Sequence, residues 1–232
     1  MGGRRMKQAR KRRGLSQQKA AAALGVSQSY LSMLETGERE LPRGLARKVV
    51  AVYGLTPTWL PLAGERWAPK KMPPQELAKE LATLGYPGFA YLRKRAARKN
   101  PAEILLTALA QEDLEARVFE ALPWLLVKFW GMDLNWLAEQ ARLRDLQNRL
   151  GFVVTLARAA AQERACANPR RDKALERLES GLKGSLLARE EVLNGTQLTE
   201  AERGWLKKHR SKEAREWNLL TNWRAEALRH VA

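Results

Sequence analysis

The sequence predicts an all-α protein in which a small N-terminal domain precedes a larger helical bundle. Two short, capped helical segments follow each other near the N-terminus, and no segment shows the sustained apolar–polar alternation typical of a strand. Residues 63–74 contain three prolines and a glycine without any periodicity. We therefore expect one domain over residues 1–63, a linker over residues 64–74 and a second domain over residues 75–232.

The composition excludes several classes of protein and of site. A single cysteine, Cys166, permits neither an internal disulfide nor a cysteine-ligated zinc site. Two histidines are too few for a histidine-rich metal site, so we expect no metal and no cofactor. No apolar run approaches the roughly 18 residues of a membrane-spanning helix. These observations indicate a cytoplasmic protein without a membrane partner.

Positive charge is concentrated in the N-terminal third of the chain. The whole chain has 42 Lys and Arg against 25 Asp and Glu, a net charge of +17. Residues 1–71 hold 15 of the basic and 4 of the acidic residues, which leaves +11 there and +6 in the remainder. Such a basic region favours a polyanionic partner, either nucleic acid or an acidic membrane surface.

Two short helices with a tight turn are expected inside this basic region. Ser16 is a candidate N-cap for the first helix, which Gly25 ends, and Ser27 is a candidate N-cap for the second, which Gly37 ends. Two helices joined in this way form a helix-turn-helix. The apolar residues spaced to bury a joint face are Ala21, Leu24, Val26, Leu31 and Leu34.

The run LSQQKAAAALGVSQSYLSMLETGER resembles the Xre/Cro-like helix-turn-helix family of phage repressors and bacterial regulators. The resemblance covers residues 5–62, with departures at Ala20, where a larger aliphatic residue is usual, and at Thr36, where asparagine is common. It implies a five-helix repressor-like domain. The helices that it implies cover residues 3–12, 16–24, 27–35, 44–53 and 56–62.

The resemblance also implies how the domain contacts double-stranded DNA. The third helix would enter the major groove, with base contacts from Gln28, Ser29, Ser32 and Met33. Residues expected to contact phosphate or to position the domain are Gln17, Gln18, Thr36, Arg39 and Arg43. Gln17 would also brace the recognition glutamine, and Arg43 would point toward the minor groove. Arg10 and Glu35 match a structural salt bridge of the family.

The second domain is expected to be an all-α bundle, and it resembles no family that we recognise. The expected helices cover residues 75–84, 87–99, 101–110, 112–129, 133–149, 152–167, 169–193, 198–209 and 211–228. Candidate N-caps are Asn100, Asp133, Asn168 and Ser211.

Tryptophans are frequent in this second domain. We expect Trp124, Trp136 and Trp205 to lie in the core, and the segment with Trp217 and Trp223 to offer a surface for a partner. The domain contains no Gly-rich phosphate loop, no paired-carboxylate motif and no histidine beside a nucleophile. We therefore do not expect an enzyme.

Together these features predict a DNA-binding transcriptional regulator, a repressor or autoregulator that binds a pseudo-palindromic operator as a homodimer. Two alternatives remain open at this point. In the first, the protein is an antitoxin or adaptor whose C-terminal domain binds a cognate protein. In the second, the C-terminal domain is a sensor that binds a small-molecule effector and controls the affinity for DNA.

Overall fold

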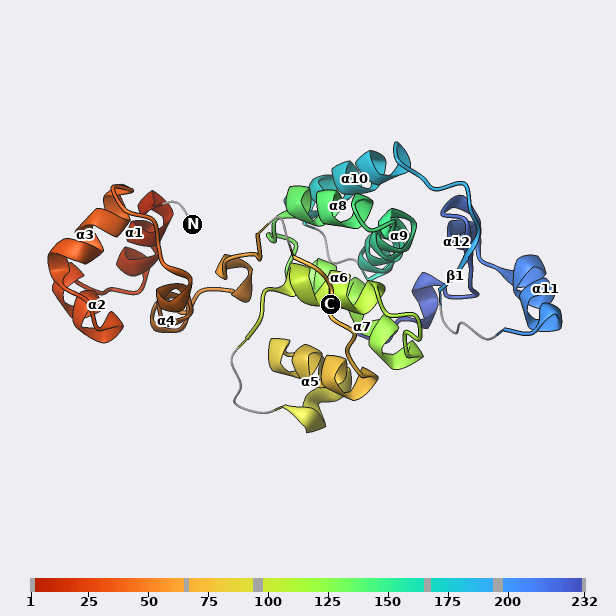
Figure 1. The fold of residues 1–232 in the computed structure, drawn as a ribbon, viewed down its shortest axis with the longest axis horizontal. Helices are drawn as coiled ribbons and strands as arrows, with labels where there is room; N and C mark the ends of the chain where they lie inside the picture. Colours follow the sequence, from red (N-terminus) through yellow and green to blue (C-terminus); the bar gives the residue numbers. More distant parts are fainter. Residues whose placement is uncertain (1–2, 65–66, 94–97, 165–167, 194–197, 231–232) are drawn as a thin grey trace. The chain divides into compact units, whose positions relative to one another are not determined.

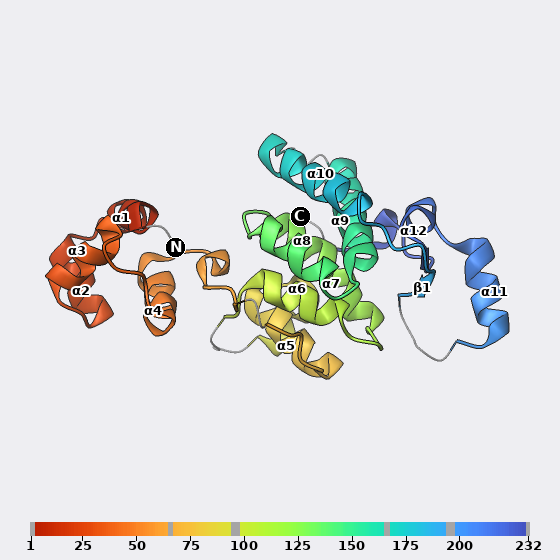
Figure 2. The same cartoon turned by 45° about the horizontal axis from the view of Figure 1, so that its top comes forward.

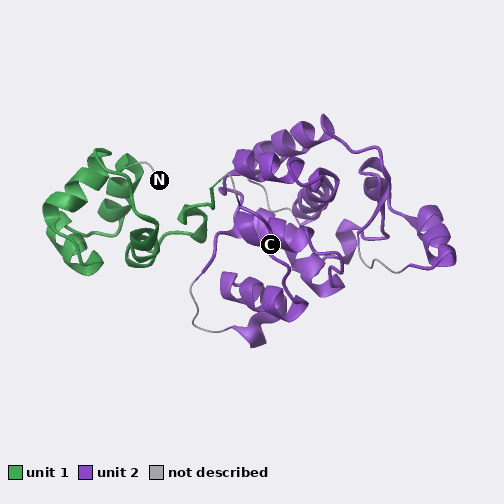
Figure 3. Cartoon of the chain, in the orientation of Figure 1, with its two compact units in different colours: residues 1–65 green, residues 66–232 purple. Residues whose placement is uncertain are grey.

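The chain forms two compact units, residues 1–65 and residues 66–232 (Figure 3). The computed structural model describes residues 3–64, 67–93, 98–164, 168–193 and 198–230. Both units are built almost entirely from helices (Figure 1), so the all-α prediction is confirmed.

Over residues 3–64, the described part of the first unit, the chain forms four α-helices and one 3-10 turn. The elements are α1 (Gly3–Arg12), α2 (Gln17–Leu24), α3 (Gln28–Thr36), α4 (Arg43–Tyr53) and η1 (Pro57–Trp59). The fifth helix, expected over residues 56–62, is therefore shorter than predicted. Pro57 begins the turn and Leu60 already has an extended conformation, with φ −64° and ψ 138°.

The helix-turn-helix is formed as the caps predict. The hydroxyl groups of Ser16 and Ser27 accept hydrogen bonds from backbone N–H groups in the first turns of α2 and α3. Gly25 and Gly37 end these helices in the left-handed conformation, at φ 72° and φ 89°, which costs glycine little because it has no Cβ. The buried core of this unit comprises Met6, Ala9, Ala20, Ala21, Leu24, Leu31, Leu34, Val49 and Tyr53.

The second unit is a helical bundle with α9 (Gln147–Glu163) at its centre. This helix packs against α10 (Pro169–Lys183) on one side and α7 (Ala116–Lys128) on another (Figures 1 and 2). The other α-helices and 3-10 turns of the unit are α5 (Pro74–Leu84), η2 (Pro87–Leu92), α6 (Pro101–Leu109), α7 (Ala116–Lys128), α8 (Leu134–Arg142), α10 (Pro169–Lys183), α11 (Glu200–His209), α12 (Lys212–Glu216) and η3 (Ala225–Ala227). The four N-caps expected from the sequence all accept a backbone hydrogen bond.

Several helix boundaries in the second unit differ from the predictions. The helix expected over 133–149 is two helices, because the chain turns at Asp145, whose φ is 56°. The helices expected over 169–193 and 211–228 end early, at Lys183 and Glu216, and a two-residue strand lies further along the chain in each range. The strands β1 (Glu191–Val192) and β2 (Leu219–Leu220) pair in parallel. The helix expected over 87–99 is the 3-10 turn η2, and residues 94–97 lie outside the described part of the chain.

Trp217 is a core residue, so the prediction that it offers a surface to a partner is wrong. Its side chain is fully buried, and its indole Nε1 donates a hydrogen bond to Thr155 Oγ1 at 2.8 Å. The ring occupies space on α9 that is open because residue 151 is glycine. Trp223 is half-buried, with its ring centroid 5.1 Å from that of Phe119.

The remaining tryptophans divide between core and surface. Trp124 is buried as expected, and Trp136 is half-buried with its ring edge against Trp67. The prediction that Trp205 lies in the core is wrong, because its side chain is 50% exposed and stacks on His209 of the same helix, α11. No residue of α11 is buried.

The segment expected as a linker is largely fixed to the second unit. From Trp67 onward, it packs against that unit through the Trp67 ring and through Gln111. The Gln111 side chain accepts a hydrogen bond from the Met72 N–H and donates one to the Lys70 carbonyl, at 2.9 and 3.0 Å. The Arg144 guanidinium lies over the Trp67 ring, 5.0 Å from its centroid. Residues 67–72 of the predicted linker therefore belong to the second unit.

The described residues contain neither a membrane-spanning helix nor a cluster of metal-ligating side chains. No helix among them has the length and hydropathy needed to cross a membrane. Within the same ranges, His, Cys, Asp and Glu side chains do not gather in groups of three or more that would hold a metal ion.

Candidate DNA interface

The helix α3 presents one buried face and one polar face. Leu31 and Leu34 are buried in the core of the first unit, whereas Gln28 and Ser29 at the start of the helix are exposed. One turn later, Ser32 and Met33 are half-buried. The four side chains that were predicted to contact bases are thus at least partly accessible. They are Gln28, Ser29, Ser32 and Met33.

A chain of hydrogen bonds connects the outer end of α3 to a buried ion pair. The Arg10 guanidinium donates two hydrogen bonds to the Glu35 carboxylate, Nε to Oε1 at 2.7 Å and Nη2 to Oε2 at 2.9 Å. The Gln17 amide donates to Glu35 Oε2 at 3.3 Å, and the Gln28 amide donates to Gln17 Oε1 at 3.5 Å. The predicted salt bridge is therefore present, and it is linked through Gln17 to the recognition glutamine.

The ion pair also fixes the backbone that precedes α2. Arg10 Nη1 donates to the Leu15 carbonyl at 2.8 Å, just before the Ser16 cap. Both charged side chains are almost completely buried, and the hydrogen bond to Glu35 raises the pKa of Arg10. One side chain thus joins α1, the turn before α2 and the end of α3. The sequence pattern identified the Arg10–Glu35 pair but not the contact with Leu15.

The residues expected to contact phosphate differ in whether their side chains already form hydrogen bonds within the protein. Gln18, Arg39 and Arg43 are exposed, and Arg43 donates to the Leu62 carbonyl at 3.2 Å. The Thr36 hydroxyl is also exposed, but it donates within its own turn toward the Met33 carbonyl and the Glu38 carboxylate. The start of α2, where Gln17 and Gln18 lie, leaves backbone N–H groups available to an anion.

Comparison with known proteins agrees with this geometry. Residues 6–60 match the family model described as helix-turn-helix. No curated protein and no solved structure matches the chain. The N-terminal unit contains an Xre/Cro-like helix-turn-helix domain. Domains of this kind are DNA-binding modules of regulators, and the match covers the first unit alone.

In the helix-turn-helix domain, general attraction to DNA and recognition of its sequence depend on different residues. Its net positive charge attracts the phosphate backbone without regard to sequence, whereas the accessible residues at the start of α3 are uncharged. Glutamine can form two hydrogen bonds to one adenine edge in the major groove. Sequence reasoning did not single out Arg5, Arg12 or Trp59 of this domain as site residues. Helical spacing would have placed Arg5 and Arg12 together, but only the fold brings Trp59 near them.

Proposed function

We propose that the protein is a repressor that binds a pseudo-palindromic operator as a homodimer. The observation that supports this best is the hydrogen-bonded chain from Arg10 through Glu35 and Gln17 to Gln28. It restrains an exposed, uncharged side chain at the start of a recognition helix. A domain that bound only phosphate would need basic side chains but no such restraint.

The proposed dimer follows from the small size of one recognition helix. Only the first residues of α3 reach base edges in this mode of binding, so one domain reads few base pairs. Two copies that bind half-sites about 34 Å apart would read enough sequence to select an operator. In this proposal the second unit supplies dimerisation and regulation, while Arg43 contacts the minor groove between the half-sites.

Affinity selection of random DNA duplexes by the full chain tests this proposal. We expect enriched sequences that contain two inverted half-sites centred about one helical turn apart. A single, non-repeated site would contradict the dimer, and the absence of any enriched sequence would contradict specific recognition. Fusion of the selected site to a reporter promoter then distinguishes repression from activation.

An exposed tryptophan favours a second candidate, an adaptor or antitoxin that binds a protein through its second unit. Trp205 is half exposed on α11, and this helix contributes no residue to the core. Tryptophan is enriched among the residues that dominate protein–protein binding energy. Co-expression with the product of an adjacent reading frame tests this candidate. A complex that Trp205→Ala abolishes would support it, and a complex that this change leaves intact would place the partner elsewhere.

A further inference from the structure

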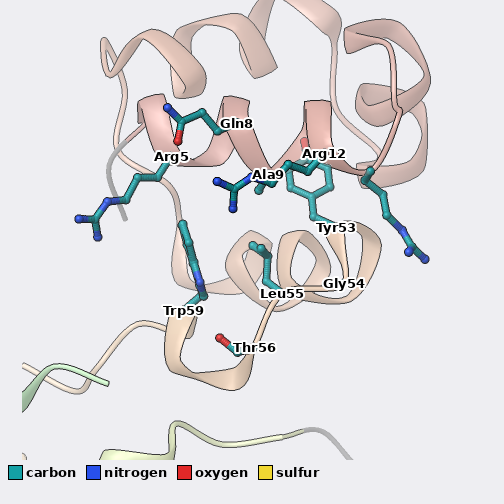
Figure 4. Close-up of a pocket in the computed structure, with 10 residues that line it drawn as sticks. Arg5, Gln8, Ala9, Arg12, Tyr53, Gly54, Leu55, Thr56 and Trp59 are labelled. Carbon is teal, nitrogen blue, oxygen red and sulfur yellow. The ribbon is translucent and has the colours of Figure 1, made fainter. Parts of the chain in front are cut away.

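A cavity of about 580 Å³ lies in the first unit, between α1 on one side and the end of α4 with η1 on the other (Figure 4). This volume is within the range of roughly 300–1,000 Å³ that small-molecule sites occupy. Arg5, Gln8 and Arg12 line it from α1, and Trp59 and Thr56 line it from the opposite side. The cavity is separate from the residues assigned above to DNA.

The charge of this cavity is entirely positive. Arg5, Arg12 and Arg13 contribute to its lining, and neither aspartate nor glutamate does. Among the described residues, no carboxylate forms a salt bridge with these three guanidinium groups. Guanidinium groups bind phosphate and carboxylate through paired hydrogen bonds. The lining therefore favours an anion.

Apolar and aromatic side chains also line the cavity. Ala9, Leu55 and the ring of Tyr53 line it, and the half-buried Trp59 forms one wall. An inorganic anion would leave this surface uncovered. A planar ring on the same ligand would pack against the indole of Trp59, as bases do on aromatic side chains of nucleic-acid-binding proteins.

The position of the cavity on α1 separates it from the base-reading residues. Arg5, Gln8 and Arg12 are spaced three and four residues apart, so they share one face of α1. Arg10 lies on a different face, where it binds Glu35 of α3. The cavity lining and the residues assigned above to DNA thus share no side chain.

We propose that this cavity is a binding site for a nucleotide. Its phosphate contacts Arg5 and Arg12, while its base packs against Trp59. Because stacking on tryptophan is tolerant of base identity, the site accepts more than one base. The site is independent of the proposed repressor activity, since it is formed within the first unit without DNA.

Isothermal titration calorimetry of the DNA-free full chain tests the proposal. The probes are adenosine 5′-monophosphate, adenosine and inorganic phosphate, each titrated separately. We expect the nucleotide to bind with a dissociation constant below about 1 mM, and each of its two parts to bind at least about tenfold more weakly. Equal binding of phosphate and nucleotide would overturn the role of Trp59, and no heat from the nucleotide would overturn the site.

Variants on the two walls make the test specific. Arg12→Gln should weaken nucleotide binding about tenfold. Arg4→Gln is the control, because it removes the same charge from an exposed position of α1 outside the cavity. It should change nucleotide binding less than about twofold. Trp59→Leu should weaken it, and Trp59→Phe, which keeps a ring, should weaken it less. Melting temperatures establish that each variant is folded. Equal effects of Arg12→Gln and Arg4→Gln on nucleotide binding would show that only diffuse electrostatic attraction holds the nucleotide, and the proposed site would be wrong.

The same variants distinguish a free nucleotide from DNA phosphate. On a duplex of scrambled sequence, Arg12→Gln and Arg4→Gln should have similar effects, because both remove one positive charge from the domain. If Arg12→Gln weakened duplex binding far more than Arg4→Gln but left nucleotide binding unchanged, the cavity would be a contact for the DNA backbone and the proposal would fail.

Discussion

Gln17 Oε1 accepts a hydrogen bond from the side-chain amide of Gln28 at 3.5 Å, and this contact crosses from α2 to α3. It restricts the rotamers of an exposed side chain before DNA arrives. Part of the entropy cost of ordering that side chain on binding is therefore met in the free protein.

The first prediction concerns the loss of this recognition side chain. Gln28→Ala should weaken binding to the selected operator by about 1–3 kcal/mol and leave binding to scrambled DNA almost unchanged. Gln17→Ala should weaken operator binding by a smaller amount, and the two effects should not add. Fluorescence anisotropy with both duplexes across a salt series provides the measurement.

Gln18→Ala is the matched control for this series, because it removes an exposed glutamine at the start of the same helix, α2. It should weaken binding to the operator and to the scrambled duplex to a similar extent, as expected for a residue near phosphate. If Gln28→Ala behaved like Gln18→Ala, Gln28 would not read bases. Additive effects of Gln17→Ala and Gln28→Ala would show that the bond between them is unimportant in the complex.

The second prediction separates the stability of the domain from its specificity. Arg10→Met leaves the Glu35 carboxylate buried without its partner and should destabilise the first unit by about 3–5 kcal/mol. Combining it with Glu35→Leu should restore much of that stability, since hydrophobic replacement of a buried pair is often nearly neutral. The double variant has lost the anchor of Gln17, so its preference for operator over scrambled DNA should fall. Urea denaturation and anisotropy test the two parts, and a double variant with full specificity would contradict the proposed role of the chain.

The third prediction is a dependence of stability on alkaline pH. Burial, together with the nearby Glu35 carboxylate, raises the pKa of Tyr53 from 10.0 to about 12. Folding therefore favours the neutral hydroxyl over its ionised form. Relative to the ionised form, this contribution to stability is complete below pH 10 and is lost as the pH rises toward 12. At pH 11 the loss should be about 1 kcal/mol.

Tyr53→Phe tests this dependence directly. The Tyr53 hydroxyl is buried and has no hydrogen-bond partner among the described residues. Its removal should therefore leave the free energy of unfolding at pH 7 unchanged, or raise it by up to about 1 kcal/mol. The variant should also lose less stability than the wild type between pH 7 and pH 11 in urea titrations. Equal losses in the two proteins would show that another group controls alkaline unfolding.

The fourth prediction concerns the contact between α9 and Trp217. A Cβ at position 151 would overlap the Trp217 ring, so Gly151→Ala should destabilise the second unit by about 1–3 kcal/mol despite the better helix propensity of alanine. Gly181→Ala in α10 is the control, because a Cβ there meets only Arg142 Nη2 at an ordinary 3.6 Å. The control should raise stability by about 0.5–1 kcal/mol. Thermal denaturation distinguishes the two, and a stabilising Gly151→Ala would contradict the described packing.

Local signals in the sequence predicted the first unit well because its structure depends on local chemistry. Serine caps and terminal glycines define α2 and α3, and each acts within a few residues of its own helix. The Arg10–Glu35 pair was accessible only through the resemblance to a family, since the two residues are far apart in the chain.

The second unit shows what local signals do not contain. The burial of Trp217 depends on the space at Gly151 and on the hydroxyl of Thr155, both in another helix. The strands β1 and β2 are two residues long, too short for an alternating pattern to appear. Trp205 has the helical spacing of a core residue, but α11 packs against too little of the bundle to bury it.

The hydrogen bonds of Gln111 to Lys70 and Met72 have a consequence for the proposed dimer. Because they attach residues 70–72 to the second unit, Gln111→Ala should release this segment and widen the range of half-site spacings that the proposed dimer binds, as measured with operators that carry inserted base pairs.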